Sequence, residues 1–126
     1  MNTERVYSKM KKKILHINSY YIARGFYYIL FEKLRTLGYD LRVFVFAEKG
    51  RKIEHDKLAN YIDVSNNFLK WDRLFFHVKH LKVYRDLKKR EKNLQDFEVV
   101  HAHSLFSNGY IAYKLKREYG VQYIVA

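Results

Sequence analysis

Hydrophobic residues in this chain follow two spacings that alternate along the sequence. Short continuous apolar runs predict buried strands, whereas apolar residues three or four positions apart predict helices with one buried face. The predicted strands span residues 14–18, 41–46, 61–64, 97–101 and 121–125. The predicted helices span residues 25–37, 70–94 and 109–119. Residues 47–57 are charged and predict a loop, and Asn66 and Asn67 predict a turn.

The two longer predicted helices each have an apolar face that we expect to pack against the sheet. In the helix at 25–37 this face consists of Phe26, Ile29, Leu30, Leu34 and Leu37. In the helix at 70–94 it consists of Leu74, Val78, Leu81, Tyr84 and Leu87. Gly38 follows the first of these helices and is the residue type that commonly ends one.

Strands that alternate with helices in this way predict a parallel sheet with helices on both faces. We therefore expect an α/β fold, a Rossmann-like doubly wound parallel sheet of about five strands in the order 3-2-1-4-5. This order places the first strand beside the fourth. The length of 126 residues suits one domain, which we place at residues 11–126 after a flexible N-terminal extension at 1–10.

Polar residues follow the predicted strand at 97–101 at once and precede a predicted helix start. Open parallel sheets bind ligands at the carboxyl ends of their strands, where the strand order reverses. Free N–H groups at a helix start also attract anions, especially phosphates. The loops at 19–25 and 103–108 should therefore face one crevice. The candidate substrate-binding residues are Asn18, Ser19, Arg24, Gly25, His101, His103, Ser104, Asn108 and Gly109.

Several of these residues also have a purely structural interpretation. A histidine within a strand, such as His101, is commonly a hydrogen-bonded core residue. Ser104, Ser107 and Asn108 belong to the residue types that cap helices. Arg24 can be a solvated loop residue rather than a phosphate ligand. The two interpretations are compatible for the capping residues, because a cap lies beside the free N–H groups.

A metal site is a further alternative for the histidines. His101 and His103 are two positions apart and share one face of a strand. A histidine pair of this kind can bind zinc, and His16 lies on the strand expected to be adjacent. Because the sequence offers no clear third ligand and no second shell, we predict no metal and no cofactor.

Composition limits the class of protein. A hydrophobic fraction of 48% and an aromatic fraction of 17% argue against disorder. Cysteine is absent, which excludes disulfides and thiolate chemistry. No apolar run approaches the ~18 residues that span a bilayer, and the N-terminus has no signal-peptide core. We therefore expect a cytoplasmic protein.

The formal net charge of +12 favours an anionic partner, which can be nucleic acid, anionic lipid or a phosphorylated substrate. Much of the charge lies in the predicted helix at 70–94, where Lys79, Lys82, Arg85 and Lys89 form a basic stripe. Such a stripe is ordinarily a solvated face. Its alternative is peripheral docking on the anionic inner membrane face, where each nearby Lys or Arg contributes roughly 1 kcal/mol.

Three segments carry a resemblance to a known enzyme family. They are KKILHIN, GFYYILFEKLRTLGYDLRVF and EVVHAHSLFSNGYIAYKLKREYGVQYIVA. In the last, His-x-His-Ser follows an apolar strand and a helix with small residues at its start comes next. Between residues 11 and 126 the chain resembles the N-terminal domain of family 4 glycosyltransferases of the GT-B type. That family often has a glycine pair in the first loop, where this chain has only Gly25.

The resemblance implies the acceptor-side part of an enzyme of polysaccharide biosynthesis. Such an enzyme transfers a sugar from a nucleotide sugar to a saccharide or lipid-linked acceptor. The family's second domain binds most of the donor, so the resemblance implies a truncated domain, inactive without a C-terminal domain or a partner chain. It assigns no catalytic residue. Two alternatives stay open: a basic nucleic-acid-binding module, for which no recognition motif is present, and a non-catalytic partner subunit.

Overall fold

The computed structural model describes residues 13–52 and 59–126, and these form a sheet with three α-helices. The strands are β1 (Lys13–Ile17), β2 (Asp40–Glu48), β3 (Ile62–Phe68), β4 (Val99–Ala102) and β5 (Tyr123–Val125). The helices are α2 (Phe26–Thr36), α3 (Phe76–Arg90) and α4 (Ser107–Tyr119). Shorter 3₁₀ helices span Lys70–Leu74 and Leu94–Asp96.

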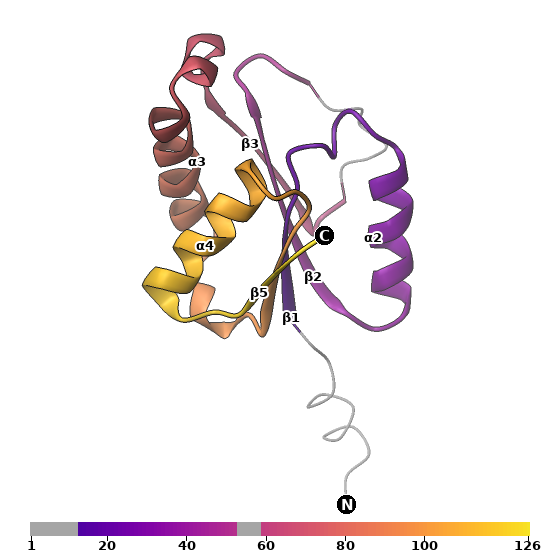
Figure 1. The fold of residues 1–126 in the computed structure, drawn as a ribbon. Helices are drawn as coiled ribbons and strands as arrows, with labels where there is room; N and C mark the ends of the chain where they lie inside the picture. The colour runs from indigo at the N-terminus through magenta and orange to yellow at the C-terminus, as the bar shows by residue number, and fades with distance from the viewer. Residues whose placement is uncertain (1–12, 53–58) are drawn as a thin grey trace, which may run out of the picture.

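All five strands are parallel and have the order β3-β2-β1-β4-β5 (Figure 1). The predicted α/β fold and the predicted strand order are confirmed. The central strand β1 pairs with β4 in a register that places His16 opposite His101. Because the chain order reverses beside β1, the loops that follow β1 and β4 leave the sheet at neighbouring points.

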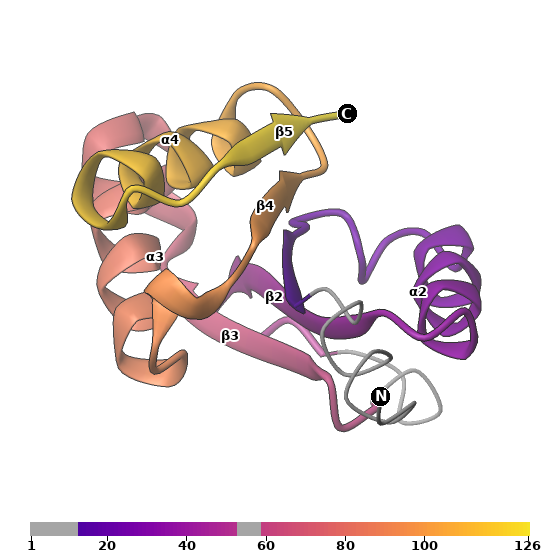
Figure 2. The same ribbon diagram turned by 90° about the horizontal axis from the view of Figure 1, so that it is seen from below.

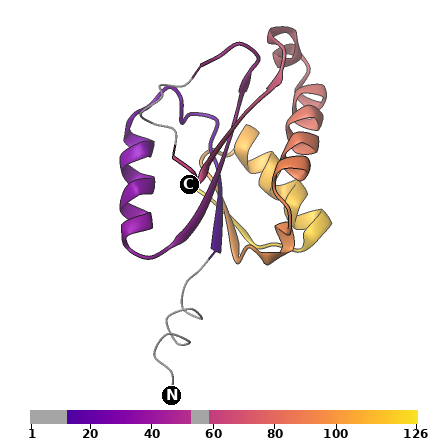
Figure 3. The same ribbon diagram turned by 180° about the vertical axis from the view of Figure 1, so that it is seen from behind.

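Helices cover the two faces of the sheet unequally. One face carries α2, and the other carries α3 and α4 (Figures 1 and 2). The view from behind shows the same division (Figure 3). Successive strand residues point to opposite faces, so Leu15 and Ile17 pack toward α3 and α4 while Ile14 packs toward α2. His16 also points toward α2, where its ring lies 4.9 Å from that of Phe31.

The sheet therefore separates two hydrophobic clusters. The cluster on the α2 side consists of Tyr21, Phe31, Leu41, Val43, Val45, Tyr61 and Ile62. The larger cluster on the α3 and α4 side consists of Leu15, Ile17, Phe44, Phe46, Phe68, Val83, Tyr84, Leu87, Leu94, Phe97, Val100, Ala102, Ile111, Ala112, Leu115 and Val121.

The predicted helix at 70–94 is wrong at both ends. The side chain of Asp72 accepts a hydrogen bond from the Leu69 N–H at 2.8 Å and closes a separate 3₁₀ turn. Phe75 then has extended backbone, so α3 starts only after it. At the other end Asn93 lies in the left-handed region with a φ of 57°, which a continuing right-handed helix does not allow.

The predicted packing faces of the two helices are also wrong in part. Phe31 is the residue of α2 that is fully buried, and Val83 is a buried residue of α3 outside the predicted face. Apolar residues occur around much of both helices, so three- and four-residue spacing allows more than one face to be chosen. The predicted face residues that are exposed are Phe26, Ile29, Leu37, Leu74, Val78 and Leu81.

The predicted turn at Asn66 and Asn67 is wrong, because both residues belong to β3. The Asn66 side chain donates to the carbonyl oxygens of Glu48 and Arg51, both at 2.9 Å, and so joins β3 to the end of β2. The predicted extension at 1–10 and part of the predicted loop at 47–57 lie outside the described residues. None of the helices in the described ranges has the length and hydropathy needed to span a membrane.

Candidate functional site

The loops after β1 and β4 meet at the carboxyl edge of the sheet. The Ser19 N–H donates to Oδ1 of Asn108 at 3.1 Å, although these residues are 89 positions apart. The His103 N–H donates to the Ile17 carbonyl oxygen at 3.0 Å and extends the pairing of β4 with β1. Asn108 is fully buried in the first turn of α4. The topology thus brings together candidate residues from both predicted loops.

Three histidines lie close together on the α2 side of this edge: His16 on β1, His101 on β4, and His103 just after β4. Nδ1 of His16 lies 2.9 Å from Nε2 of His103. The His101 and His103 rings stack with centroids 4.1 Å apart. The rings of Phe31 and Tyr27, both on α2, each lie 5.5 Å from the His103 ring.

Burial keeps the three imidazoles uncharged near neutral pH. Desolvation, and then the charges of His103 and His101, lower the pKa of His16 to about 3. Desolvation, and then the charge of His101, lowers the pKa of His103 to about 4. Desolvation also lowers the pKa of His101. The cause is physical: a charged imidazole under the aromatic rings of α2 would lose its hydration without gaining an opposite charge.

The asparagines of the site hold the loops rather than cap a helix. Oδ1 of Asn18 accepts the Tyr20 N–H at 2.8 Å and shapes the start of the loop after β1. The structural alternative of helix capping does not hold for Ser107 and Asn108, because α4 starts at Ser107 and its preceding residue, Phe106, makes no side-chain cap. Within the described residues, the Nδ2 atoms of Asn18 and Asn108 are buried without a hydrogen-bond partner.

The remaining candidates have mainly structural surroundings. A Cβ on Gly109 would lie 3.1 Å from the Ser104 carbonyl oxygen, so the start of α4 packs tightly against the loop after β4. Gly25 precedes α2 with right-handed backbone that any residue can adopt. Arg24 lies over the Tyr20 ring, 5.9 Å from its centroid. Neither Arg24 nor Gly25 lines the pocket described next.

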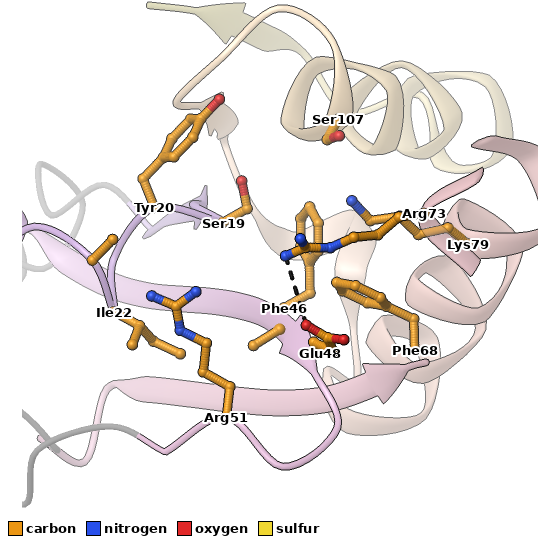
Figure 4. A pocket seen from close by; sticks show the side chains of 12 residues that line it. Ser19, Tyr20, Ile22, Phe46, Glu48, Arg51, Phe68, Arg73, Lys79 and Ser107 are labelled. Carbon is orange, nitrogen blue, oxygen red and sulfur yellow. Dashed lines mark ion pairs between the residues drawn. The ribbon is translucent and has the colours of Figure 1, made fainter. Parts of the chain in front are cut away.

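An open pocket of about 420 Å³ lies at the same edge, on the α3 and α4 side. Arg73 and Lys79 extend into it from the α3 side, and Arg51 extends from the loop after β2 (Figure 4). The lining residues are Ser19, Tyr20, Ile22, Ala23, Phe46, Ala47, Glu48, Arg51, Phe68, Arg73, Lys79 and Ser107.

Cationic side chains outnumber acidic ones in this pocket. Arg51, Arg73 and Lys79 face a single carboxylate, Glu48, which forms an ion pair with Arg73 at 3.8 Å. The Lys79 ammonium lies 4.7 Å from the centroid of the Phe68 ring. Burial, and to a lesser extent the Arg73 charge, lowers the pKa of Lys79. The pocket is therefore an electropositive space with one internal counter-charge.

Sequence reasoning missed most of this pocket. Glu48 ends β2 and Arg51 lies in the loop after it, whereas Arg73 comes from the 3₁₀ turn that had been predicted as helix. Lys79 was expected in a solvated basic stripe, with membrane docking as the alternative, and the structure places it half-buried in the pocket. A usable signal was the topology itself, because the carboxyl end of β2 lies beside that of β1 in the predicted strand order.

The other members of the predicted basic stripe lie outside the pocket. Lys82 forms an ion pair with Asp72 at 2.7 Å. Arg85 and Lys89 are exposed and line a shallow depression with Asp86. Docking of these residues on an anionic membrane stays a prediction, and so do the predicted small-molecule partners.

Comparison with known proteins gives a likeness in fold. The chain matches no family model and no curated protein. It is similar to two crystal structures of the C-terminal domain of PF1911 hydrogenase from Pyrococcus furiosus. One has a TM-score of 0.63 and 18% identity, and the match covers 91% of this chain and 91% of that chain. The other has a TM-score of 0.60 and 19% identity, covering 90% and 89%. Identity this low shows a shared parallel α/β fold and leaves activity open.

The predicted membership in the glycosyltransferases is wrong. The structural match is to a hydrogenase domain, and the comparisons give no glycosyltransferase match. This finding also overturns the predicted GT-B architecture, the predicted sugar transfer and the predicted role in polysaccharide biosynthesis. The motif misled because a polar loop between an apolar strand and a helix start is common to parallel α/β domains. In this chain, packing explains the glycine at position 109, because its backbone lies close to the Ser104 carbonyl oxygen.

Proposed function

We propose that this chain is a ligand-binding domain whose pocket takes a small molecule that carries a phosphate or diphosphate group. The observation that supports the proposal is the convergence of Arg51, Arg73 and Lys79 on one open pocket beside the start of α4. The cations come from separate elements, so their proximity results from the fold and not from a charged run in the sequence.

Each group has a distinct part in the proposed binding. The guanidinium groups of Arg51 and Arg73 can each donate two parallel hydrogen bonds to phosphate oxygens. The Lys79 ammonium acts as a point charge held against the Phe68 ring. Ser107 lies in the first turn of α4, where N–H groups have no partner within the helix and the helix dipole favours an anion.

Glu48 is the competitor in this arrangement. Its carboxylate pairs with Arg73 at 3.8 Å, and a bound phosphate would take over that guanidinium. Entry of an anion would also raise the lowered pKa of Lys79, because an opposite charge stabilises the ammonium. A chain without cysteine is compatible with the reducing cytoplasm, and we place the proposed function there.

Calorimetric titration with inorganic pyrophosphate tests the proposal. We expect saturable binding near pH 7 that weakens as salt is added, since salt screens partly exposed charges. Arg73→Gln and Arg51→Gln should each weaken binding by roughly tenfold, because a hydrogen bond to a charged group contributes about 1.5–3 kcal/mol. Glu48→Gln should strengthen binding, since it frees Arg73. ADP and UDP, compared with adenosine and uridine, separate phosphate recognition from recognition of the base.

Arg85→Gln is the matched control, because it removes the same charge from an exposed position outside the pocket. We expect it to change affinity by less than about twofold, the size of a screened long-range effect. Equal losses in Arg73→Gln and Arg85→Gln would mean that net charge rather than the pocket attracts the anion. Absence of saturable binding by the wild-type chain would overturn the proposal.

A further inference from the structure

The three histidines on the α2 side form a cluster that the proposed anion pocket does not use. Each offers one ring nitrogen, and these nitrogens all lie within 4.8 Å of one another. His16 and His103 are buried, and His101 is half-buried. His16 and His101 lie on adjacent paired strands, and His103 directly follows β4, where its N–H donates to the Ile17 carbonyl oxygen of β1. Strand pairing therefore sets the spacing of all three side chains.

We propose that His16, His101 and His103 together bind one divalent transition-metal ion, with zinc as the best-suited ion. This inference is independent of the phosphate-binding proposal, because the imidazoles face α2 and do not line the cation-lined pocket. It departs from the sequence-based expectation of no metal site, which rested on the lack of a clear third ligand and of a second shell although His16 was expected on the adjacent strand. The fold supplies that ligand from β1.

The close grouping of three ligand nitrogens, together with buried nitrogens that lack a partner, sets this cluster apart from a single core histidine. Buried polar atoms nearly always have a hydrogen-bond partner. Here Nε2 of His16 and Nε2 of His101 are buried and have none within the described residues. His80 on α3 also has a buried Nε2 without a partner, but its Nδ1 lies 2.7 Å from the Phe76 carbonyl oxygen, and within the described residues it belongs to no such group of ligand atoms. A core that needed only packing would be better served by apolar residues than by three imidazoles.

The spacing of the nitrogens suits a metal after small side-chain adjustments. Zinc–nitrogen bonds of about 2.0–2.1 Å in a tetrahedron place two ligand nitrogens roughly 3.3 Å apart. Nδ1 of His16 and Nε2 of His103 are 2.9 Å apart, so this pair would open by a few tenths of an ångström. The hydrogen between them would leave, and the metal would take its place. The three ligand nitrogens now lie within 4.8 Å of one another, so the His101 ring, stacked on His103 with centroids 4.1 Å apart, would turn to bring its nitrogen to the metal.

The donor set selects the kind of metal. Imidazole nitrogen suits zinc and copper, whereas magnesium and calcium prefer oxygen ligands. Three protein ligands leave a fourth tetrahedral position for water or another small ligand.

Titration of the metal-free full chain, without a polyhistidine tag, with Co²⁺ and Zn²⁺ tests the site. We expect one Co²⁺ per chain, visible absorption bands typical of tetrahedral cobalt, and loss of those bands when Zn²⁺ is added. Zn²⁺ should also raise the melting temperature in a concentration-dependent manner, because it binds the folded state. His101→Asn should weaken binding by about tenfold or more, since loss even of a supporting group costs that much.

Two controls and a second variant keep the result interpretable. His77→Asn removes an exposed histidine, and His80→Asn removes a buried one outside the cluster; both should retain the cobalt bands. His103→Asn should abolish them, and far-ultraviolet circular dichroism checks that it folds. His101→Asn, at a half-buried position, remains decisive if His103→Asn unfolds. Absence of cobalt bands in the wild-type chain, or their persistence in folded His101→Asn, would overturn the proposal.

Discussion

At the carboxyl edge, the basic side chains on the two sides of the sheet differ in their exposure to solvent and therefore in their charge. On the α3 and α4 side, Arg51, Arg73 and Lys79 reach an open pocket. On the α2 side, His16 and His103 lie buried beneath aromatic rings. The first group can hold positive charge in contact with solvent. The second group is uncharged near neutral pH, because burial lowers the pKa of both histidines.

This difference shows how one strand order produces two kinds of chemistry. The histidines come from β1, β4 and the residue after β4, whereas the cations of the pocket come from the loop after β2, the 3₁₀ turn and α3. Charged groups in water attract anions, and neutral imidazoles in a dry site are ready ligands for metals. The comparison predicts that acid, cavities and loop changes affect the two sides differently.

Acid should have the largest effect, and it should act through the α2 side. The folded-state pKa values of His16, about 3, and His103, about 4, lie below the ordinary value of 6.5. The unfolded chain therefore binds more protons than the folded chain in this range. Stability is fully present above pH 6.5 and is lost as the pH falls toward 4 and then 3. Each histidine contributes a slope of about 1.4 kcal/mol per pH unit.

Urea unfolding of the metal-free chain at a series of pH values measures this slope. Two histidines together would cost several kcal/mol by pH 4.5, which is comparable to the whole stability of an ordinary domain. The double variant His16→Gln, His103→Gln should flatten the pH dependence, whatever its stability at pH 7. The variant His80→Gln removes only one buried histidine and should flatten it less. An unchanged slope in the double variant would show that other groups cause acid sensitivity.

The strand order was predictable from sequence, because short apolar runs alternate with helical spacings along most of the chain. The meeting of Ser19 with Asn108 follows from that order alone, since both leave neighbouring strands. Helix faces were less predictable. In α3, Leu81 is exposed while Val83 is buried, and both are apolar. The spacing of apolar residues does not say which of two overlapping faces meets the sheet.

The site was harder to predict because its members come from distant segments. Arg73 belongs to a 3₁₀ turn that depends on the Asp72 side chain, and helical spacing gives no sign of such a turn. The third histidine, His16, was visible in the sequence, but its distance from His103 depends on strand register. A local motif therefore gave a wrong family, whereas the topology placed the carboxyl edge correctly.

Removal of one core side chain from each side of the sheet should show which side makes the free energy of unfolding depend on pH. Phe31→Ala should lower the free energy of unfolding by about 3–5 kcal/mol, and Leu87→Ala by about 2–5 kcal/mol. Both residues are fully buried, on the α2 side and the α3 side respectively. Of these two side chains, Phe31 is the one that contacts the His16 ring, with centroids 4.9 Å apart. Its loss admits water and moves the pKa of His16 back toward its ordinary value.

Urea unfolding of both variants at pH 7.5 and pH 5.5 makes the comparison. The stability difference between the two pH values should shrink in Phe31→Ala and stay as in wild type in Leu87→Ala. The two variants serve as controls for each other, because each creates a cavity in one hydrophobic cluster. An equal reduction of the pH effect in both would mean that general loosening, rather than wetting of the histidines, is responsible.

The smallest effect should come from Asn108, which lies where the two loops meet. Its Oδ1 accepts the Ser19 N–H at 3.1 Å, whereas the neighbouring His103 N–H is held by the backbone oxygen of Ile17 at 3.0 Å. Asn108→Ala should cost about 1 kcal/mol, the contribution of one hydrogen bond. The substitution should also speed hydrogen exchange at the Ser19 amide, measured by NMR, with the His103 amide as internal control.

Equal protection of the Ser19 amide in the wild-type protein and in Asn108→Ala would mean that the side-chain hydrogen bond does not hold the loop. Loss of protection at His103 as well would mean that Asn108 supports the edge of the sheet itself. Selective exposure of Ser19 is the expected result, because strand pairing holds His103 and one side-chain acceptor holds Ser19.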